Sequence, residues 1–252
     1  MRVKSPLVCL LLISLCVCSS VFSQDGLPLF HKMQDALGGA NRIAAVRDFE
    51  ELVLGESWNG NTGRSMGEVR KRTRWIRPNH LRIDQAGPGS TYVLYFDGTS
   101  GWEVLPGTQQ AVELTGGELE FARRMLTGFR LNTWIADRDA RYHITSPSAN
   151  VVRVSDGTIE HQLDITVDAA SSLPARIKFV TLSDPAHPTP GEDVFAEWET
   201  VQGIRFPRRY TVFRSGVRVA EAKDVRTSVN VGLSPSDLAA KPPDLKPVLP
   251  SR

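Results

Sequence analysis

The sequence predicts an α+β fold built on an antiparallel β-sheet. Short stretches of alternating apolar and polar residues recur about every ten residues, with Gly, Pro, Asn and Asp between them, as is typical of strands joined by tight turns. Two longer stretches instead carry apolar residues at helical spacing, which indicates amphipathic helices. Strands and helices do not alternate, so a parallel sheet made of βαβ units is excluded.

The first 23 residues have the pattern of an export signal. Two basic residues precede an apolar run from Pro6 to Cys18, and Val21 and Ser23 occupy the positions three and one before the predicted cleavage point. The run is shorter than the roughly 20 apolar residues that a membrane-spanning helix needs. We therefore expect residues 1–23 to be cleaved and the mature chain to be exported, with the periplasm as its compartment.

Cleavage after Ser23 removes all three cysteines, so the mature chain would hold neither a disulfide nor a thiolate metal site. Lipid attachment at Cys16 or Cys18 is the alternative, although the residues before them are bulkier than a lipoprotein cleavage site normally has. The signal also contains two of the 30 Lys and Arg residues and none of the 28 Asp and Glu residues. The mature chain is then formally neutral, which argues against nucleic acid as a partner. Its length fits one domain, placed at residues 24–240 and followed by a Pro-rich tail at residues 241–252.

The predicted domain opens on an amphipathic helix that runs from Leu29 to Leu37 and ends at Gly38-Gly39. One further helical turn is expected at Asn41–Val46, with Asn41 as its N-cap. From Arg47 the apolar period changes to two, which indicates strands. The strands expected in this first half are 52–58, 66–76, 81–84, the two arms of 91–105, and 111–114.

The clearest element is the hairpin Thr91–Leu105, in which Asp97-Gly98 joins two apolar runs. Tyr92–Phe96 is apolar on both of its alternating faces, so neither side of this strand simply faces water. One face should meet the core. The other needs a cover, which could be a helix, a second sheet or a ligand.

A second amphipathic helix is expected at Gly116–Phe129, with its acidic residues before its arginines, as the helix dipole favours. Strands then resume, and in the first of them Ile159 is expected to share a face with Ile165 and Val167. Ser234–Leu238 is a candidate last helical turn. The strands expected in this second half are 158–167, 174–182, 194–201, 204–214 and 217–231.

No local motif for catalysis or metal binding is present. The five histidines have no metal-ligand spacing, and neither a Gly-x-Ser-x-Gly turn nor a phosphate-binding Gly loop occurs. Asp137, Asp139 and His143 are better explained as a polar loop than as an acid–base cluster. We therefore predict a protein that is not an enzyme and has no cofactor and no metal.

A basic run precedes the hairpin. Arg70, Arg72 and Arg74 fall on one face of the predicted strand 66–76, where they are candidates for contacts to anionic headgroups at a membrane surface or a cavity mouth. The alternative is that these long basic side chains only solvate and protect an outer strand.

Several turn motifs follow one another in order between about Leu29 and Leu238: Met33-Gln-Asp-Ala-Leu-Gly-Gly-Ala, Arg77-Pro78, Tyr95-Phe-Asp-Gly with Gly101-Trp102, Val201-Gln-Gly-Ile-Arg-Phe-Pro207 and Asn230-Val-Gly-Leu. In this order they resemble the motifs of the outer-membrane lipoprotein-sorting (LolA/LolB-like) superfamily. The resemblance is narrower to exported bacterial domains that stand alone or are attached to insulinase-type zinc peptidases. Peptidase zinc motifs are absent from this sequence, so only the accessory domain would correspond.

The resemblance implies a strongly curved antiparallel sheet, an incomplete β-barrel, with helices covering the concave face over an apolar cavity for acyl chains or other lipids. We accordingly expect a monomeric carrier whose ligand is a lipid and whose further partners are membrane or envelope proteins. The alternative is an interaction or scaffold domain with a filled core and no ligand. The residues expected to line the cavity are Leu94, Phe96, Trp102, Leu119, Leu126 and Phe129.

Overall fold

The computed structural model describes residues 24–88, 90–107, 110–159, 161–181 and 188–241. The predicted export signal and residues 242–252 of the predicted tail lie outside the described residues. The strands are β1 (Gln24–Asp25), β2 (Asp48–Trp58), β3 (Ser65–Ile76), β4 (His80–Gly87), β5 (Ser90–Phe96), β6 (Gly101–Val104), β7 (Ala111–Glu113), β8 (His143–Ser148), β9 (Val151–Ser155), β10 (Leu163–Val167), β11 (Pro174–Thr181), β12 (Thr189–Val201), β13 (Ile204–Arg214) and β14 (Val217–Val229).

The described helices are few and mostly short. Gly38, with a φ of 120°, ends the first helix as predicted, but the second helix has Gly39 rather than Asn41 as its N-cap. Ser234 caps the last helix by accepting a hydrogen bond from the backbone N–H of Asp237 at 3.3 Å. The helices are α1 (Leu27–Leu37), α2 (Ala40–Ala44), α3 (Gly116–Thr127), α4 (Arg130–Thr133), the 3-10 helix η1 (Ala136–Arg138) and α5 (Pro235–Ala239).

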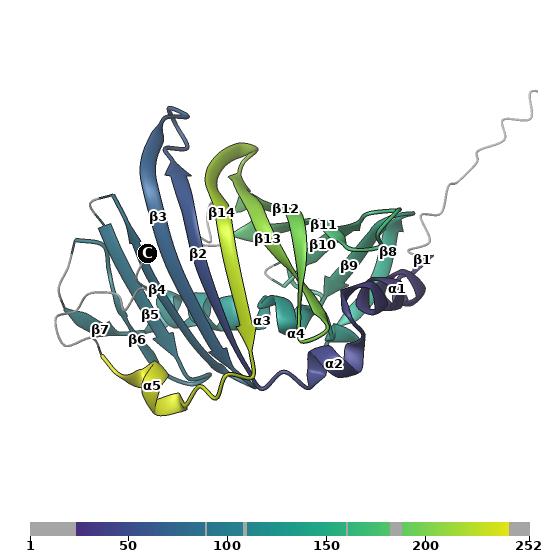
Figure 1. Ribbon diagram of the computed structural model, residues 1–252, viewed down its shortest axis with the longest axis horizontal. Coiled ribbons are helices and arrows are strands. Elements are labelled where there is room, and N and C mark those ends of the chain that lie inside the picture. Colours follow the sequence, from purple (N-terminus) through teal and green to yellow (C-terminus); the bar gives the residue numbers. More distant parts are fainter. Residues whose placement is uncertain (1–23, 89, 108–109, 160, 182–187, 242–252) are drawn as a thin grey trace, which may run out of the picture.

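The 14 strands of the described residues form one antiparallel sheet, in the order β1-β8-β9-β10-β11-β12-β13-β14-β2-β3-β4-β5-β6-β7. The pairing of β14 with β2 joins the two halves of the chain at the middle of the sheet (Figure 1). The sheet ends at β1 on one side and at β7 on the other, and these two end strands do not pair with each other. The sheet is therefore curved without closing into a barrel. The predicted curved antiparallel α+β fold is confirmed.

The main core lies on the concave face, where α1, α2, α3 and α4 pack against strands from both halves of the sheet. Figure 1 shows α3 and α4 running behind the long central strands. Trp75 of β3 and Phe96 of β5 are fully buried in this core, and α3 contributes Ala122 and Leu126. The helices therefore cover the concave face, as expected.

A smaller core lies on the opposite face, under α5. Leu238 of α5 packs there against Val93, Tyr95, Trp102 and Val104. The second apolar face of the predicted hairpin is thus covered by a helix, which answers the question that its sequence left open.

Two predictions about the middle of the chain were wrong. Strands β8 and β9 lie in a segment to which no strand was assigned, because β8 is rich in exposed polar residues and pairs at the edge with the two-residue β1. Ile159 is exposed rather than on the strand face of Ile165, because the chain turns before β10. In that turn Asp156 accepts a hydrogen bond from the N–H of Thr158 at 2.9 Å.

We expect Gly55→Ala to lower the free energy of unfolding by about 1–3 kcal/mol, since overpacking of this kind forces backbone shifts. Gly55 lies on β2 opposite a bulge in β14, where the register skips Lys223, and a Cβ at position 55 would lie 2.3 Å from the carbonyl oxygen of Glu221. Gly60→Ala is the matched control, because its Cβ would meet only a Val219 methyl at 3.6 Å. Urea denaturation of the two variants tests the difference, and equal stabilities would contradict it.

Candidate functional site

Helix α3 fills only part of the concave face and leaves a cavity on each of its two sides. The helix is bounded by Gly116-Gly117 and Gly128, and it buries only Ala122 and Leu126. Phe121 and Met125 of α3 face one cavity, which we call the central cavity. Arg123 and Thr127 face the other, which we call the basic cavity.

The central cavity encloses about 310 Å³ between α3, α4 and strands from both halves of the sheet. That volume lies at the lower end of the range for small-molecule sites, roughly 300–1,000 Å³. Most of its lining is apolar, as expected for such a site. The apolar lining residues are Leu81, Ile83, Phe121, Met125, Phe129, Leu163, Ile177, Phe179, Val180 and Phe195.

The same cavity also contains charged side chains from several elements. Glu51 of β2 is 2% exposed and lies 2.8 Å from the guanidinium of Arg130 of α4. Asp193 of β12 lies 4.0 Å from the guanidinium of Arg214, and Lys71 of β3 also faces the cavity. Burial lowers the pKa of the Lys71 amino group and raises the pKa of the Asp193 carboxyl. The cavity is therefore apolar over most of its wall and charged at one part of it.

One polar atom of this wall, Thr73 Oγ1, is buried and has no hydrogen-bond or ion-pair partner within the described part of the chain. A buried group without a hydrogen-bond partner costs about 1–3 kcal/mol. Such a group is therefore usually matched by water or by a ligand. The other buried polar atoms of the wall, Glu51 Oε2, Arg130 Nη1 and Asp193 Oδ1, belong to the two ion pairs.

The basic cavity, of about 460 Å³, is more polar, and its arginines already have partners within the chain. Arg77 donates to the backbone oxygen of Val46 at 3.0 Å, and burial lowers its pKa. Arg141 makes a two-pronged contact to the carboxylate of Asp139. The other two arginines of its lining bind Glu120 and Asn41. Because these cations are engaged, the basic cavity is the weaker candidate for a binding site.

The six residues predicted to line one cavity lie in several places. Phe129 lines the central cavity, whereas Phe96 and Leu126 line the basic cavity. Leu94 is completely buried in the main core, and Leu119 packs against that core.

Trp102 is on the wrong face for the predicted role. It lies directly opposite Tyr95 in the β5–β6 pair, and cross-strand partners share a face of the sheet. Tyr95 alternates with Leu94 and Phe96, so Tyr95 and Trp102 face α5 rather than the concave side. The error arose because the register of this pair was unknown.

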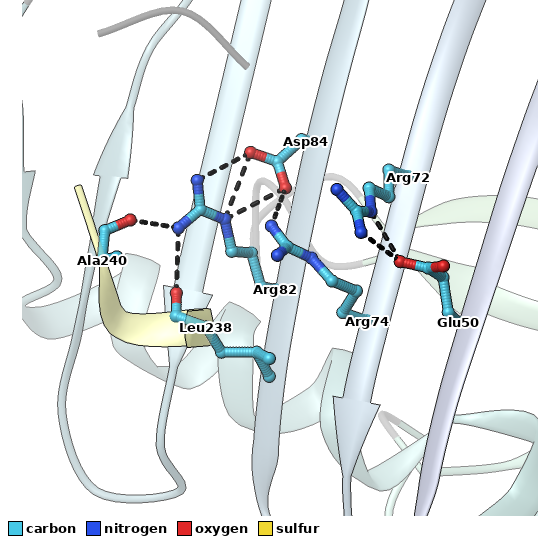
Figure 2. A network of polar contacts seen from close by, with 7 residues as sticks. All are labelled: Glu50, Arg72, Arg74, Arg82, Asp84, Leu238 and Ala240. Carbon is cyan, nitrogen blue, oxygen red and sulfur yellow. Dashed lines mark hydrogen bonds and ion pairs between the residues drawn. The ribbon is translucent and has the colours of Figure 1, made fainter. Parts of the chain in front are cut away.

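The prediction that Arg70, Arg72 and Arg74 share one strand face is confirmed, but that face is the one opposite the cavities. Lys71 and Thr73, which alternate with these arginines, line the central cavity. The nitrogen–oxygen distance from Arg70 to Glu68 is 3.1 Å. The corresponding distances are 2.5 Å from Arg72 to Glu50 and 2.8 Å from Arg74 to Asp84, and both pairs are drawn in Figure 2. Placement at a cavity mouth was therefore wrong. The outer-strand alternative was wrong too, because β3 lies between β2 and β4.

The strongest polar contacts on this opposite face attach α5 to the sheet (Figure 2). Asp84 is fully buried and accepts hydrogen bonds from Arg74 at 2.8 Å and from Arg82 at 2.9 Å. Arg82 also donates to the carbonyl oxygens of Leu238, at 3.0 Å, and of Ala240. The buried charges of Arg74, Arg82 and Asp84 therefore stabilise the contact between the sheet and α5.

Asp137, Asp139 and His143, the residues considered for acid–base chemistry, do not bind one another in the structure. No group of three His, Cys, Asp or Glu side chains suited to a metal occurs among the described residues. Asp137 accepts a hydrogen bond from Gln34 at 2.7 Å, Asp139 binds Arg141, and His143 is exposed on β8. In the described part of the chain no helix is long and apolar enough to cross a membrane.

Lys71, Phe121, Phe179 and Phe195 of the central cavity were missed in the sequence. For Lys71 a signal existed, because it stands an even number of residues from Trp75 in a period-two strand and therefore shares the core-facing side. Phe179 and Phe195 lie on β11 and β12, and only the tertiary structure brings them opposite α3.

These features define an open, curved antiparallel sheet with helices over an internal cavity, and solved structures share this fold. A DUF1329 family protein from Desulfovibrio piger has a TM-score of 0.54 and 13% identity, over 85% of this chain and 97% of that one. A LolA superfamily protein from Nitrosomonas europaea has a TM-score of 0.52 and 12% identity, over 86% and 98%. A domain named for outer membrane lipoprotein sorting, from Vibrio parahaemolyticus, has a TM-score of 0.50 and 12% identity, over 84% and 95%.

No protein-family model and no curated protein matches the chain. At identities of 12–13% the likeness concerns the fold, and it covers most of the chain. The resemblance to the lipoprotein-sorting superfamily is confirmed at that level.

Proposed function

We propose that this chain is an exported, non-enzymatic carrier that binds an acyl chain or similar apolar ligand in the central cavity. The observation that carries the proposal is the apolar wall formed by α3 and by strands of both halves of the sheet around about 310 Å³. Burial of apolar surface stabilises a complex by about 25 cal/mol per Å², or about 0.8 kcal/mol per methylene, so a chain can be held without specific polar contacts.

Two further observations support the proposal. A solved structure of this fold is named for the sorting of outer membrane lipoproteins, which are proteins with attached lipid. The cover of the cavity is also lightly held, because α3 buries only Ala122 and Leu126 and has glycines at both ends. A ligand could therefore enter at a small cost in packing.

The proposal predicts that Phe121→Asp weakens binding of 1-decanol by roughly 10–100-fold. Phe121 is half-buried on α3, and the new carboxylate would replace apolar wall worth about 1.5–3 kcal/mol, with each 1.4 kcal/mol equal to a tenfold change in Kd. Isothermal titration calorimetry on the mature chain measures the affinity. Val112→Asp is the matched control, because Val112 is 45% exposed on β7 and does not line the cavity.

The rival scaffold function predicts that wild-type protein binds no decanol and carries no lipid when it is purified from a periplasm and analysed by native mass spectrometry. That pair of results would overturn the carrier proposal. An equal loss of affinity in Phe121→Asp and Val112→Asp would place the binding outside the central cavity.

A further inference from the structure

The charges around the central cavity do not cancel. Arg130 lies beside Glu51 at 2.8 Å, and Arg214 lies 4.0 Å from Asp193. Arg124 of α3 also lines the cavity, and Lys71 of β3 remains after the two pairs. Its amino group has no carboxylate within 4.0 Å and donates no hydrogen bond among residues 24–88, 90–107, 110–159, 161–181 and 188–241. Lys71 is therefore a cation of the lining that neither pair neutralises.

Thr73 provides a second polar group beside this amine. It lies two residues along the same face of β3, about 7 Å away at the rise of a strand. Its side chain is 5% exposed, and its hydroxyl has no hydrogen-bond partner within the described chain. Lys71 offers three donors and the Thr73 hydroxyl offers one, so together they suit an acceptor-rich anion.

The apolar wall begins next to this polar pair. Thr73 is paired across the sheet with Ile83, which lines the cavity, and Phe129 stacks on Trp75, the next residue on that face of β3. A ligand with an anion at one end and an apolar chain beside it would contact both parts at once.

Burying the unpaired amino group of Lys71 costs free energy when no anionic ligand is bound. Removing a lysine from water disfavours its charged form, and burial accordingly lowers the pKa of Lys71. The charged groups that face it are Glu51 of β2, Asp193 of β12, Arg130 of α4 and Arg214 of β13, two anions and two cations. A bound anion would favour the protonated amine and offset that cost.

We propose that the central cavity selects amphiphiles with an anionic headgroup, a carboxylate or a phosphate, and that Lys71 and Thr73 bind this headgroup while the chain lies along the apolar wall. The inference rests on the proposed carrier function and adds the chemical class of its ligand.

The test compares ligands with one chain and different headgroups. Decanoate, decyl phosphate and 1-decanol are titrated into the mature wild-type chain and into Lys71→Met, which keeps the length of the side chain and removes the charge. A hydrogen bond to a charged group contributes about 1.5–3 kcal/mol, so Lys71→Met should weaken binding of the tighter anion by roughly 10–100-fold and leave 1-decanol unchanged. The comparison of decanoate with decyl phosphate identifies the headgroup.

Arg72→Met is the matched control, since it removes a cation from the adjacent residue of β3 on the opposite face of the sheet. It should leave all three affinities unchanged. Thr73→Val is a second, milder test that keeps the shape of the side chain, and it should weaken anion binding by about 2–10-fold, the worth of one hydrogen bond. Preference for at least one of the two anions over the alcohol, lost in Lys71→Met and kept in Arg72→Met, would support the proposal.

Two results would overturn the inference and leave the carrier function standing. One is wild-type protein that binds 1-decanol as tightly as both anions. The other is a Lys71→Met variant that weakens the alcohol and the anions equally, which would mean that Lys71 acts through the shape of the cavity. Wild-type protein that binds none of the three ligands would overturn both the inference and the carrier function.

Discussion

Asp84→Asn should lower the free energy of unfolding by about 3–5 kcal/mol, the cost of breaking a buried ion pair from one side. Asp84 is 0% exposed, and its two oxygens bind the guanidinium groups of Arg74 and Arg82, which are themselves buried (Figure 2). The substitution keeps the shape of the side chain but leaves two cations facing each other without an anion. Because Arg82 also holds the carbonyl oxygens of Leu238 and Ala240, α5 should be released from the sheet before the rest unfolds.

Glu50→Gln provides the comparison on the same face. Glu50 binds Arg72, but both side chains are about one-fifth exposed, at 19% and 23%, so solvent screens the pair and the expected loss is about 0–1 kcal/mol. Guanidinium denaturation of both variants, followed by far-UV circular dichroism, measures the two free energies. An Asp84→Asn variant that is no less stable than Glu50→Gln would contradict this account of the charged face.

Trp75→Ala should also cost about 3–5 kcal/mol, as truncation of a large buried aromatic does. Trp75 is 0% exposed at the centre of the concave core. Its ring stacks on Phe129 with the centroids 5.2 Å apart, and the guanidinium of Arg77 lies 4.8 Å from its ring centroid. The variant would leave a cavity next to Phe129, the N-cap residue of α4.

Trp198→Ala is the control for this second effect. Trp198 is only partly buried on β12, where it meets Phe195 edge-on at 5.9 Å, so its truncation should cost no more than about half as much. Thermal and urea unfolding of the two variants give the comparison. A loss of less than about 1 kcal/mol in Trp75→Ala would show that α4 does not depend on this ring.

Elements that depend on the chemistry of a few neighbouring residues were predicted correctly. The Asp97-Gly98 hairpin, the helix that ends at Gly38 and the last turn capped by Ser234 each depend on turn or capping chemistry within a few residues. The hairpin β8–β9 was missed because a short edge hairpin needs little apolar alternation, and only Val152 and Val154 of it are buried in the core.

The candidate site was predicted less well, because it depends on register. Arg70, Arg72 and Arg74 were correctly assigned to one face, but period-two alternation says nothing of which face is concave. The same strand presents Lys71 and Thr73 to the central cavity, and neither residue was predicted as part of a site. Trp102 was misplaced for a related reason, since its face follows from its pairing with Tyr95.

The sequence by itself thus determined the α+β class, the antiparallel order of most strands and the need to cover both sides of Tyr92–Phe96. These follow from patterns that span a few residues. Only the tertiary structure decided that α5 covers one side, that α3 leaves a cavity on the other, and that Lys71 and Thr73 meet Phe179 and Phe195 across it. The physical reason is that these contacts join residues about a hundred or more positions apart, which the curvature of the sheet brings together and local periodicity does not encode.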